Sequence, residues 1–347
     1  MNLPQSSNIN ANILASCFKN TVATYKFYWL LAIVESVEEG KVKIPKIELF
    51  SKMISSAWYT VNYFKISFGV QDELHNKTIL IKELENLTID IDKIKLLKKI
   101  GNPSNKQTTK ELDHFDKNVP HWFLSPWFNQ SSKNEIYIRS QKFENNCLYA
   151  LFREEIIINP HWIVYLTENA KIIKDFCFWN LSLFLQSKNP NVPDIPNKLI
   201  KPIIRNSLTK QTNDFWKIVF EKERFINCIF TEKPLRFEDK NFALDHYVPH
   251  AFVSHDLIWN LAPIDKGFNN RKSDRLPFKE IHFERFFQLQ EKAFQINKTF
   301  KPNSKYMEEY LTIFSNLDNF NKERFKEVIL PLITIASNNG FSYLKDE

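Results

Sequence analysis

The chain has 347 residues, of which 43% are hydrophobic and 25% charged, a composition typical of a globular protein with two or three compact units. With only 5 glycines and no Walker-type or dinucleotide fingerprint, glycine-rich phosphate-binding loops are excluded. A formal net charge of +7 favours a polyanionic partner, although a lysine-rich composition alone produces the same excess.

In the N-terminal part, residues 1 to about 12 are polar, and we expect them to be disordered. The stretch Gly101–Lys110 is polar as well and is expected to be a surface loop. Two β-rich pieces, Tyr149–Phe152 and Glu155–Ile158, predict a short hairpin. Apolar spacing near 3.6 residues predicts helices at four places: Thr21–Glu39, Ile47–Phe64, Asp90–Ile100 and Ala170–Gln186.

The apolar run Phe27–Val34 is too short to span a bilayer, and it lacks the flanks of a signal peptide. We therefore expect no membrane partner. The four cysteines show no paired spacing, which indicates a reducing compartment and predicts a cytoplasmic protein. They are Cys17, Cys147, Cys177 and Cys228.

A linker is predicted over Asn189–Asn197, because its three prolines fix the backbone and interrupt hydrogen bonding. This divides the chain into residues 1–195, mainly α-helical with an aromatic core, residues 198–284, and a helical C-terminal extension over residues 285–347. A helix over residues 200–225 is expected to lead into the middle part.

The middle part contains the most informative segment of the chain. Asp245 directly precedes His246, an Asn260-Leu261 pair follows, and Asn269 comes shortly before the basic tail Arg271–Pro277. The β-forming residues of Phe242–Val248 predict a strand, and Trp259–Ile264 predicts a return strand, with a helix from Phe268 onward.

This ordered set resembles the HNH endonucleases, whose ββα-metal fold hydrolyses phosphodiesters. The resemblance, which covers roughly a fifth of the chain, implies that the ββα motif forms a nuclease domain over residues 198–284. Together with the mainly helical N-terminal region, which resembles no known family, and the helical tail, this predicts an α+β protein. It assigns His246 as the general base and Asn260 as the residue that hydrogen-bonds backbone and holds the loop carrying the histidine. Asp245 and Asn269 would hold one divalent cation.

These assignments fit the chemistry. Phosphodiester hydrolysis needs a base for the attacking water and a cation for the developing charge. Histidine is basic near neutral pH, and the oxygen donors of Asp245 and Asn269 match Mg²⁺ or Mn²⁺. Arg271 and Lys272 are expected to contact DNA phosphates. His250 and His255 lie in the loop that varies in the family, and no function is expected of them.

The chain departs from the family at the structural zinc that many HNH proteins hold with two Cys-x-x-Cys pairs. Cys228 occupies the first position, but Thr231, Asp265 and Phe268 stand at the other three. One cysteine cannot hold a tetrahedral zinc ion, so we expect no structural zinc. Phe268 is expected to fill the space by apolar packing.

Together these observations predict a metal-dependent DNA endonuclease, with restriction or anti-phage defence suggested by analogy with bacterial proteins of this layout. The N-terminal region would recognise the target or bind a protein partner. Two alternatives stay open: a non-catalytic DNA-binding or assembly module on the same scaffold, and a nuclease directed at RNA, since such a site contacts backbone rather than bases.

Overall fold

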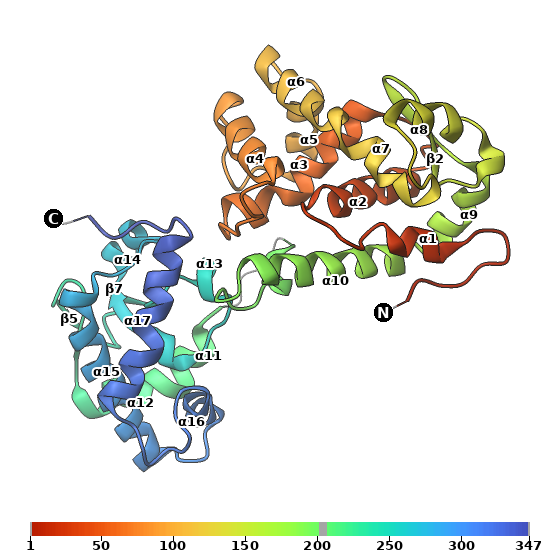
Figure 1. Ribbon diagram of the computed structural model, residues 1–347. Coiled ribbons are helices and arrows are strands. Elements are labelled where there is room, and N and C mark those ends of the chain that lie inside the picture. Colours follow the sequence, from red (N-terminus) through yellow and green to blue (C-terminus); the bar gives the residue numbers. More distant parts are fainter. Residues whose placement is uncertain (1, 201–206, 346–347) are drawn as a thin grey trace. The chain divides into compact units, whose positions relative to one another are not determined.

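The computed structural model describes residues 2–200 and 207–345, which fold into two compact units (Figure 1). The first unit contains Met1–Pro190 and Ile195–Lys201, and the second contains Asn191–Asp194 and Pro202–Glu347. The division falls within and just after the predicted linker. Helices dominate and the sheets are small, so the chain is an α+β protein, as predicted. Among the described helices, none combines the length and apolar character that crossing a membrane requires.

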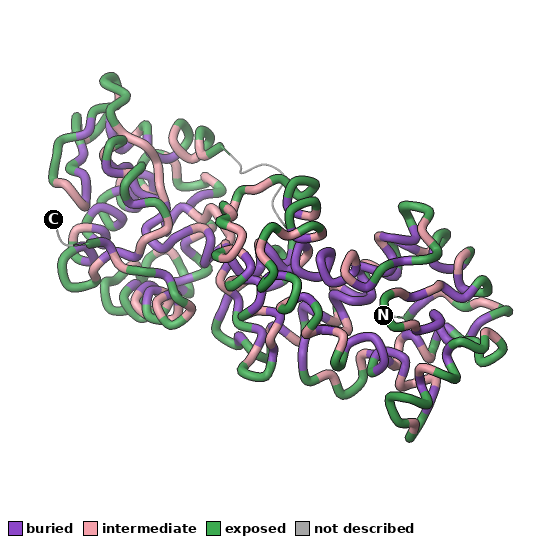
Figure 2. Tube along the Cα trace, turned by 90° about the horizontal axis from the view of Figure 1, so that it is seen from above, coloured by how far each residue is buried: buried purple, intermediate pink, exposed green. Residues whose placement is uncertain are grey.

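The first unit is mainly helical, and buried and exposed residues alternate along the chain (Figure 2). The apolar run Phe27–Val34 is the buried centre of α2, which packs against both α3 and α10. Its helices are α1 (Ala11–Ser16), α2 (Tyr25–Glu38), α3 (Lys46–Asn62), α4 (Glu73–Leu84), α5 (Lys93–Gly101), α6 (Lys106–Asp113), α7 (Val119–Phe123), α8 (Lys133–Ser140), α9 (Pro160–Glu168) and α10 (Ala170–Lys188). Short 3-10 turns cover His114–Lys117, Ser125–Trp127, Phe143–Asn145 and Pro196–Lys198.

A three-stranded antiparallel sheet completes the first unit, with strand order β1-β3-β2. Its strands are β1 (Lys43–Pro45), β2 (Tyr149–Leu151) and β3 (Glu155–Ile158). The predicted hairpin is confirmed as β2 and β3, in which Tyr149 is opposite Ile158. Strand β1 was not predicted, because three residues are too few for an alternating pattern to be recognised.

Four predicted helices correspond to α2, α3, α5 and α10, but two other expectations for this unit were wrong. Residues 1 to about 12 were expected to be disordered; instead Leu3 and Ile9 are buried, and the Tyr165 hydroxyl donates to the Pro4 carbonyl at 2.8 Å. The expected loop Gly101–Lys110 contains the start of α6, whose first turn is capped by the side chain of Asn105.

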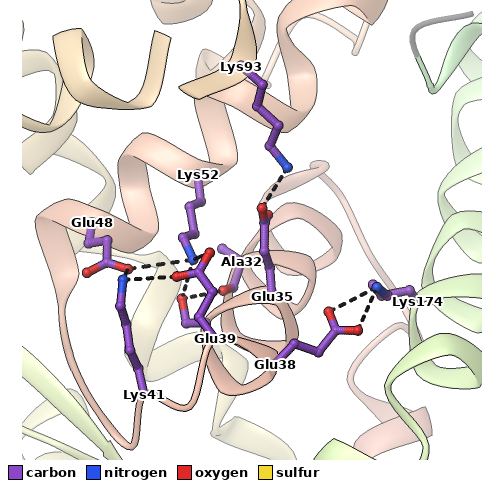
Figure 3. Close-up of polar contacts among 10 residues, drawn as sticks. Ala32, Glu35, Glu38, Glu39, Lys41, Glu48, Lys52, Lys93 and Lys174 are labelled. Atoms are coloured by element: carbon purple, nitrogen blue, oxygen red, sulfur yellow. Dashed lines mark hydrogen bonds and ion pairs between the residues drawn. The ribbon is translucent and has the colours of Figure 1, made fainter. Parts of the chain in front are cut away.

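Paired charges tie the C-terminal end of α2 to its neighbours (Figure 3). The buried Lys52 ammonium lies 2.8 Å from Glu39 and donates to the Ser36 hydroxyl at 3.0 Å. The partly exposed Lys174 pairs with Glu38 at 2.9 Å and so links α10 to α2. Because a buried ammonium is costly without partners, these contacts make the charge on Lys52 tolerable in the core.

The second unit combines short strands with helices. Its strands are β4 (Ile226–Asn227), β5 (Pro234–Leu235), β6 (Phe242–His246) and β7 (Leu261–Asp265). Its helices are α11 (Thr209–Gln211), α12 (Lys217–Glu223), α13 (His250–Val253), α14 (Lys266–Lys272), α15 (Lys279–Phe300), α16 (Lys305–Glu309) and α17 (Lys322–Asn338), with a π-helical turn over Thr212–Trp216 and 3-10 turns over Ile258–Asn260 and Tyr310–Thr312. Helix is therefore present over much of the predicted range 200–225, of which residues 201–206 lie outside the described residues.

The C-terminal helices and the β6–β7 pair belong to one unit, and residue 285, where a separate extension was expected to begin, lies inside α15. The buried Gln290 side chain on α15 donates to the Leu261 carbonyl at 2.7 Å and accepts from the Tyr310 hydroxyl at 2.6 Å. Tyr247, just after β6, stacks on Phe286 with ring centroids 3.9 Å apart. Helix α15 thus holds both strands of the pair.

This arrangement predicts that residues Pro202–Glu347 fold without the first unit. Nearly 150 residues with their own aromatic core are enough for an independent domain. The fragment should show one cooperative unfolding transition by circular dichroism. An insoluble fragment, or one that unfolds without cooperativity, would mean that the second unit needs the first to complete its core.

Candidate active site

The segment singled out in the sequence folds as two antiparallel strands followed by a helix. In the β6–β7 pair, Asp245 lies opposite Ala262 and His246 lies opposite Leu261. Helix α14 follows β7 directly and packs against both strands. The Asp265 carboxylate caps this helix by accepting the Phe268 amide at 2.8 Å, so α14 begins at Lys266, slightly before the predicted start.

Asn260 closes the loop between the two strands. Its fully buried carboxamide accepts from the Val248 amide and donates to the Val248 carbonyl, both at 2.9 Å. The Tyr247 amide adds a bond to the Asn260 carbonyl at 2.7 Å. The backbone hydrogen bonds expected of Asn260 are therefore present, and they fix the chain immediately after His246.

The His246 imidazole is buried and is oriented by a carboxylate. Its Nε2 lies 2.9 Å from Oδ1 of Asp256, a residue in the loop that Asn260 closes. When Nε2 carries the proton and donates it to Asp256, the lone pair of the neutral ring is on Nδ1. In that tautomer Nδ1 is the ring nitrogen that can accept a proton.

Two more histidines lie in the same loop. His250, at the start of α13, has its Nε2 3.8 Å from the same Asp256 oxygen, and its ring centroid is 5.1 Å from that of His246. Burial, together with the positive charge that His246 and His250 can carry, lowers the pKa of His255 to about 4. His255 is therefore neutral at physiological pH.

Sequence reasoning did not identify Asp256 and expected no function of His250. Ligand atoms of His246, His250 and Asp256 all lie within 4.8 Å of one another. No spacing rule marks these residues, because the loop that brings them together varies in length and is shaped by the contacts of Asn260. The signal for Asp256 is its carboxylate within hydrogen-bonding range of His246, and this contact is visible only in the folded chain.

Asp245 points to α14 rather than to the loop, as expected for a strand residue adjacent to His246. Its Oδ2 accepts a hydrogen bond from the Lys272 ammonium at 2.8 Å, and the same ammonium donates to the His246 carbonyl at 2.8 Å. Asn269 lies one turn before Lys272 and so on the same helix face. The structure therefore places Asp245 and Asn269 on facing elements.

The donor set of Asp245 and Asn269 fits a hard divalent cation. Within the described residues, neither Oδ1 of Asp245 nor the side-chain amide of Asn269 has a hydrogen-bond partner, so two oxygens remain for an ion. Carboxylate and amide oxygens are the donors that Mg²⁺ and Mn²⁺ prefer. An ion there would share the Asp245 carboxylate with Lys272.

The two basic residues expected to contact phosphate differ in position. Arg271 is exposed and fits that expectation. Lys272 does not: its side chain is only 1% exposed, and its ammonium is held by Asp245 and by the His246 backbone. The expected phosphate contact is therefore replaced by an internal role, in which Lys272 fastens α14 to the end of β6.

Three residues that stand where the family has zinc ligands, Cys228, Asp265 and Phe268, lie close together. Cys228 is buried, and its Sγ accepts a hydrogen bond from the Asp265 amide at 3.2 Å. Phe268 stacks on Phe230 with ring centroids 5.0 Å apart and an interplanar angle of 20°. Aromatic packing and a thiol–amide contact thus join the β4–β5 hairpin to the start of α14.

Comparison with protein families gives a match over residues 228–278 to the model described as HNH endonuclease, which confirms the resemblance seen in the sequence. The matched residues include Cys228, both strands of the β6–β7 pair and α14. Comparison with curated proteins gives no match, and comparison with solved structures gives none either.

Replacing Lys272 by Met should destabilise the protein by about 2–4 kcal/mol, because it leaves the partly buried Asp245 carboxylate without its cation. Lys266, exposed at the start of the same helix, provides the control, since Lys266→Met should change the free energy of unfolding by less than about 0.5 kcal/mol. Urea unfolding of both variants measures this. Equal stability of the two would show that Lys272 does not fasten α14 to β6.

Proposed function

We propose that the chain is a metal-dependent endonuclease that hydrolyses DNA phosphodiester bonds at the β6–β7–α14 site. The observation that carries the proposal is the buried pair of His246 and Asp256, beside Asp245 and within the segment that matches the HNH endonuclease model. A buried imidazole oriented by a carboxylate is the arrangement of a general base rather than of a passive core histidine.

In this proposal His246 accepts the proton of a water molecule at Nδ1 while Asp256 stabilises the resulting imidazolium through Nε2–H. The water oxygen attacks phosphorus in line, the bond from phosphorus to the 3′ oxygen breaks, and the departing 3′ oxygen takes a proton from solvent. By the resemblance, the products carry a 5′-phosphate and a 3′-hydroxyl. Asn260 keeps the imidazole in place through the Val248 backbone.

Asp245 and Asn269 would hold one Mg²⁺ or Mn²⁺ ion. When bound, such an ion neutralises charge on a phosphate oxygen and on the departing 3′ oxygen. Lys272 adds positive charge beside the same carboxylate from inside the protein, and exposed Arg271 is placed to contact backbone phosphate. The net charge of +7 supports an anionic polymer as substrate.

We assign the first unit to target recognition or to binding a protein partner, since the proposed catalytic residues all lie in the second unit. Restriction or anti-phage defence in the cytoplasm is the setting that we propose by analogy with other nucleases of this layout. Parallel incubation with plasmid DNA and with RNA distinguishes the proposed substrate from the RNA alternative.

His246→Ala should reduce cleavage by about 10²- to 10⁴-fold, because the attacking water loses its base. Plasmid cleavage in Mg²⁺ or Mn²⁺ measures this, with EDTA as the blank. DNA binding at fixed salt should stay within a few-fold of wild type, which separates loss of catalysis from loss of folding. Cleavage by the variant within tenfold of wild type would remove His246 from the role of base.

Asn269→Ala should raise the Mg²⁺ concentration needed for half-maximal cleavage at least about tenfold, since an ion would lose one of its two protein ligands. Asn270→Ala is the matched control, because Asn270 is exposed on the same helix and should leave the metal requirement unchanged. If both variants need the same Mg²⁺ concentration as wild type, Asn269 is not a ligand.

A further inference from the structure

The His246, His250 and Asp256 side chains form a second cluster of possible ligands, separate in chemistry from Asp245 and Asn269. Two imidazole nitrogens and a carboxylate oxygen are the donors typical of Zn²⁺ and similar transition-metal ions, whereas Mg²⁺ prefers oxygen alone. From these residues we propose that the cluster binds one Zn²⁺ ion and that the bound ion inhibits the nuclease. The inhibition rests on the proposed function; the binding does not.

The spacing of the three groups suits a single ion. A tetrahedral zinc with bonds of about 2.0–2.2 Å separates neighbouring ligand atoms by about 3.3–3.5 Å. The two distances to Asp256 Oδ1, 2.9 Å from His246 Nε2 and 3.8 Å from His250 Nε2, lie on either side of that value. All three ligand atoms lie within 4.8 Å of one another, so binding one ion requires the side chains to adjust only within this cluster.

The surroundings allow an ion to enter. His246 is buried, but the side chains of His250 and Asp256 are 17% and 19% exposed, so the cluster opens to solvent on their side. The Glu309 carboxylate accepts the amide of Ile258, a residue of the same loop, at 2.5 Å. Burial raises the pKa of Glu309, and Lys305 lowers it.

Inhibition follows from the tautomer of His246. A neutral imidazole has one N–H, and a metal can bind only the nitrogen that carries the lone pair. Zinc on Nε2 therefore puts the proton on Nδ1, the nitrogen that has to accept a proton from water. The same ion removes Asp256 from Nε2, and the ring can no longer act as a base. This ion differs from the structural zinc of the family, which Cys228 would have held.

Titration calorimetry with ZnCl₂ on the full-length, EDTA-treated and dialysed chain tests the binding. Wild type should bind one equivalent of zinc at this cluster, and the affinity should fall at least about tenfold in His250→Gln. His161→Gln, which changes an exposed histidine of the first unit, and Cys228→Ala are the controls and should bind as wild type does. Equal zinc affinity in wild type and His250→Gln, or loss of binding in Cys228→Ala, would overturn the site.

Cleavage assays in Mg²⁺ with added Zn²⁺ test the inhibition. Wild type and His161→Gln should be inhibited at the zinc concentration at which the cluster fills, and His250→Gln should resist inhibition at least about tenfold better. Wild type that binds zinc at the cluster but cleaves at an unchanged rate would overturn the inhibition. If the protein cleaves no nucleic acid but His250→Gln still loses zinc binding, the proposed nuclease activity is wrong and the zinc site is supported.

Discussion

The two hydrogen bonds between the Asn260 carboxamide and the Val248 backbone are the constraint on which the site depends. They join the end of β6 to the start of β7 in a fully buried position. Without them Val248 would leave an unsatisfied amide and carbonyl in the core, at a cost of about 1–3 kcal/mol for each buried group. The loop that they close contains Asp256, whose carboxylate lies 2.9 Å from the His246 imidazole.

The charges of the site are arranged in two layers on either side of β6. On the helix side, Lys272 and Asp245 form a buried pair whose ammonium also binds the His246 carbonyl. On the loop side, Asp256 pairs with the His246 ring. Asp245 and His246 thus pair with different partners, so a cation at Asp245 and a proton acceptor at His246 do not compete for the same carboxylate.

The separation of the two layers also explains how one site can respond differently to two kinds of metal ion. We propose that hard ions bind the oxygen donors of Asp245 and Asn269, and that ions that prefer nitrogen bind His246 and His250. In our proposals the first kind supports the reaction and the second stops it. The reaction and its inhibition both depend on the His246 imidazole being held in a single orientation.

Much of this architecture could be predicted from the sequence, since the spacing of His246, Asn260 and Asn269 and the β-forming residues around them define a ββα motif. Apolar periodicity likewise predicted four helices of the first unit. Asp256 could not be predicted, because its pairing with His246 depends on how a loop closes. The burial of Lys272 was missed because a lysine one turn beyond Asn269 is indistinguishable, by sequence, from one that faces phosphate. Leu3 and Ile9 are too isolated for periodicity to reveal that their segment packs.

We propose that Asp245 and Asn269, on facing elements, form the metal site that serves His246. Anomalous diffraction from crystals of the full-length chain soaked in Mn²⁺ tests this most directly, because it locates the ion without reference to activity. We expect a manganese peak about 2.0–2.3 Å from oxygens of Asp245 and Asn269. A peak bound by His246, His250 and Asp256, with none beside Asp245, would contradict it.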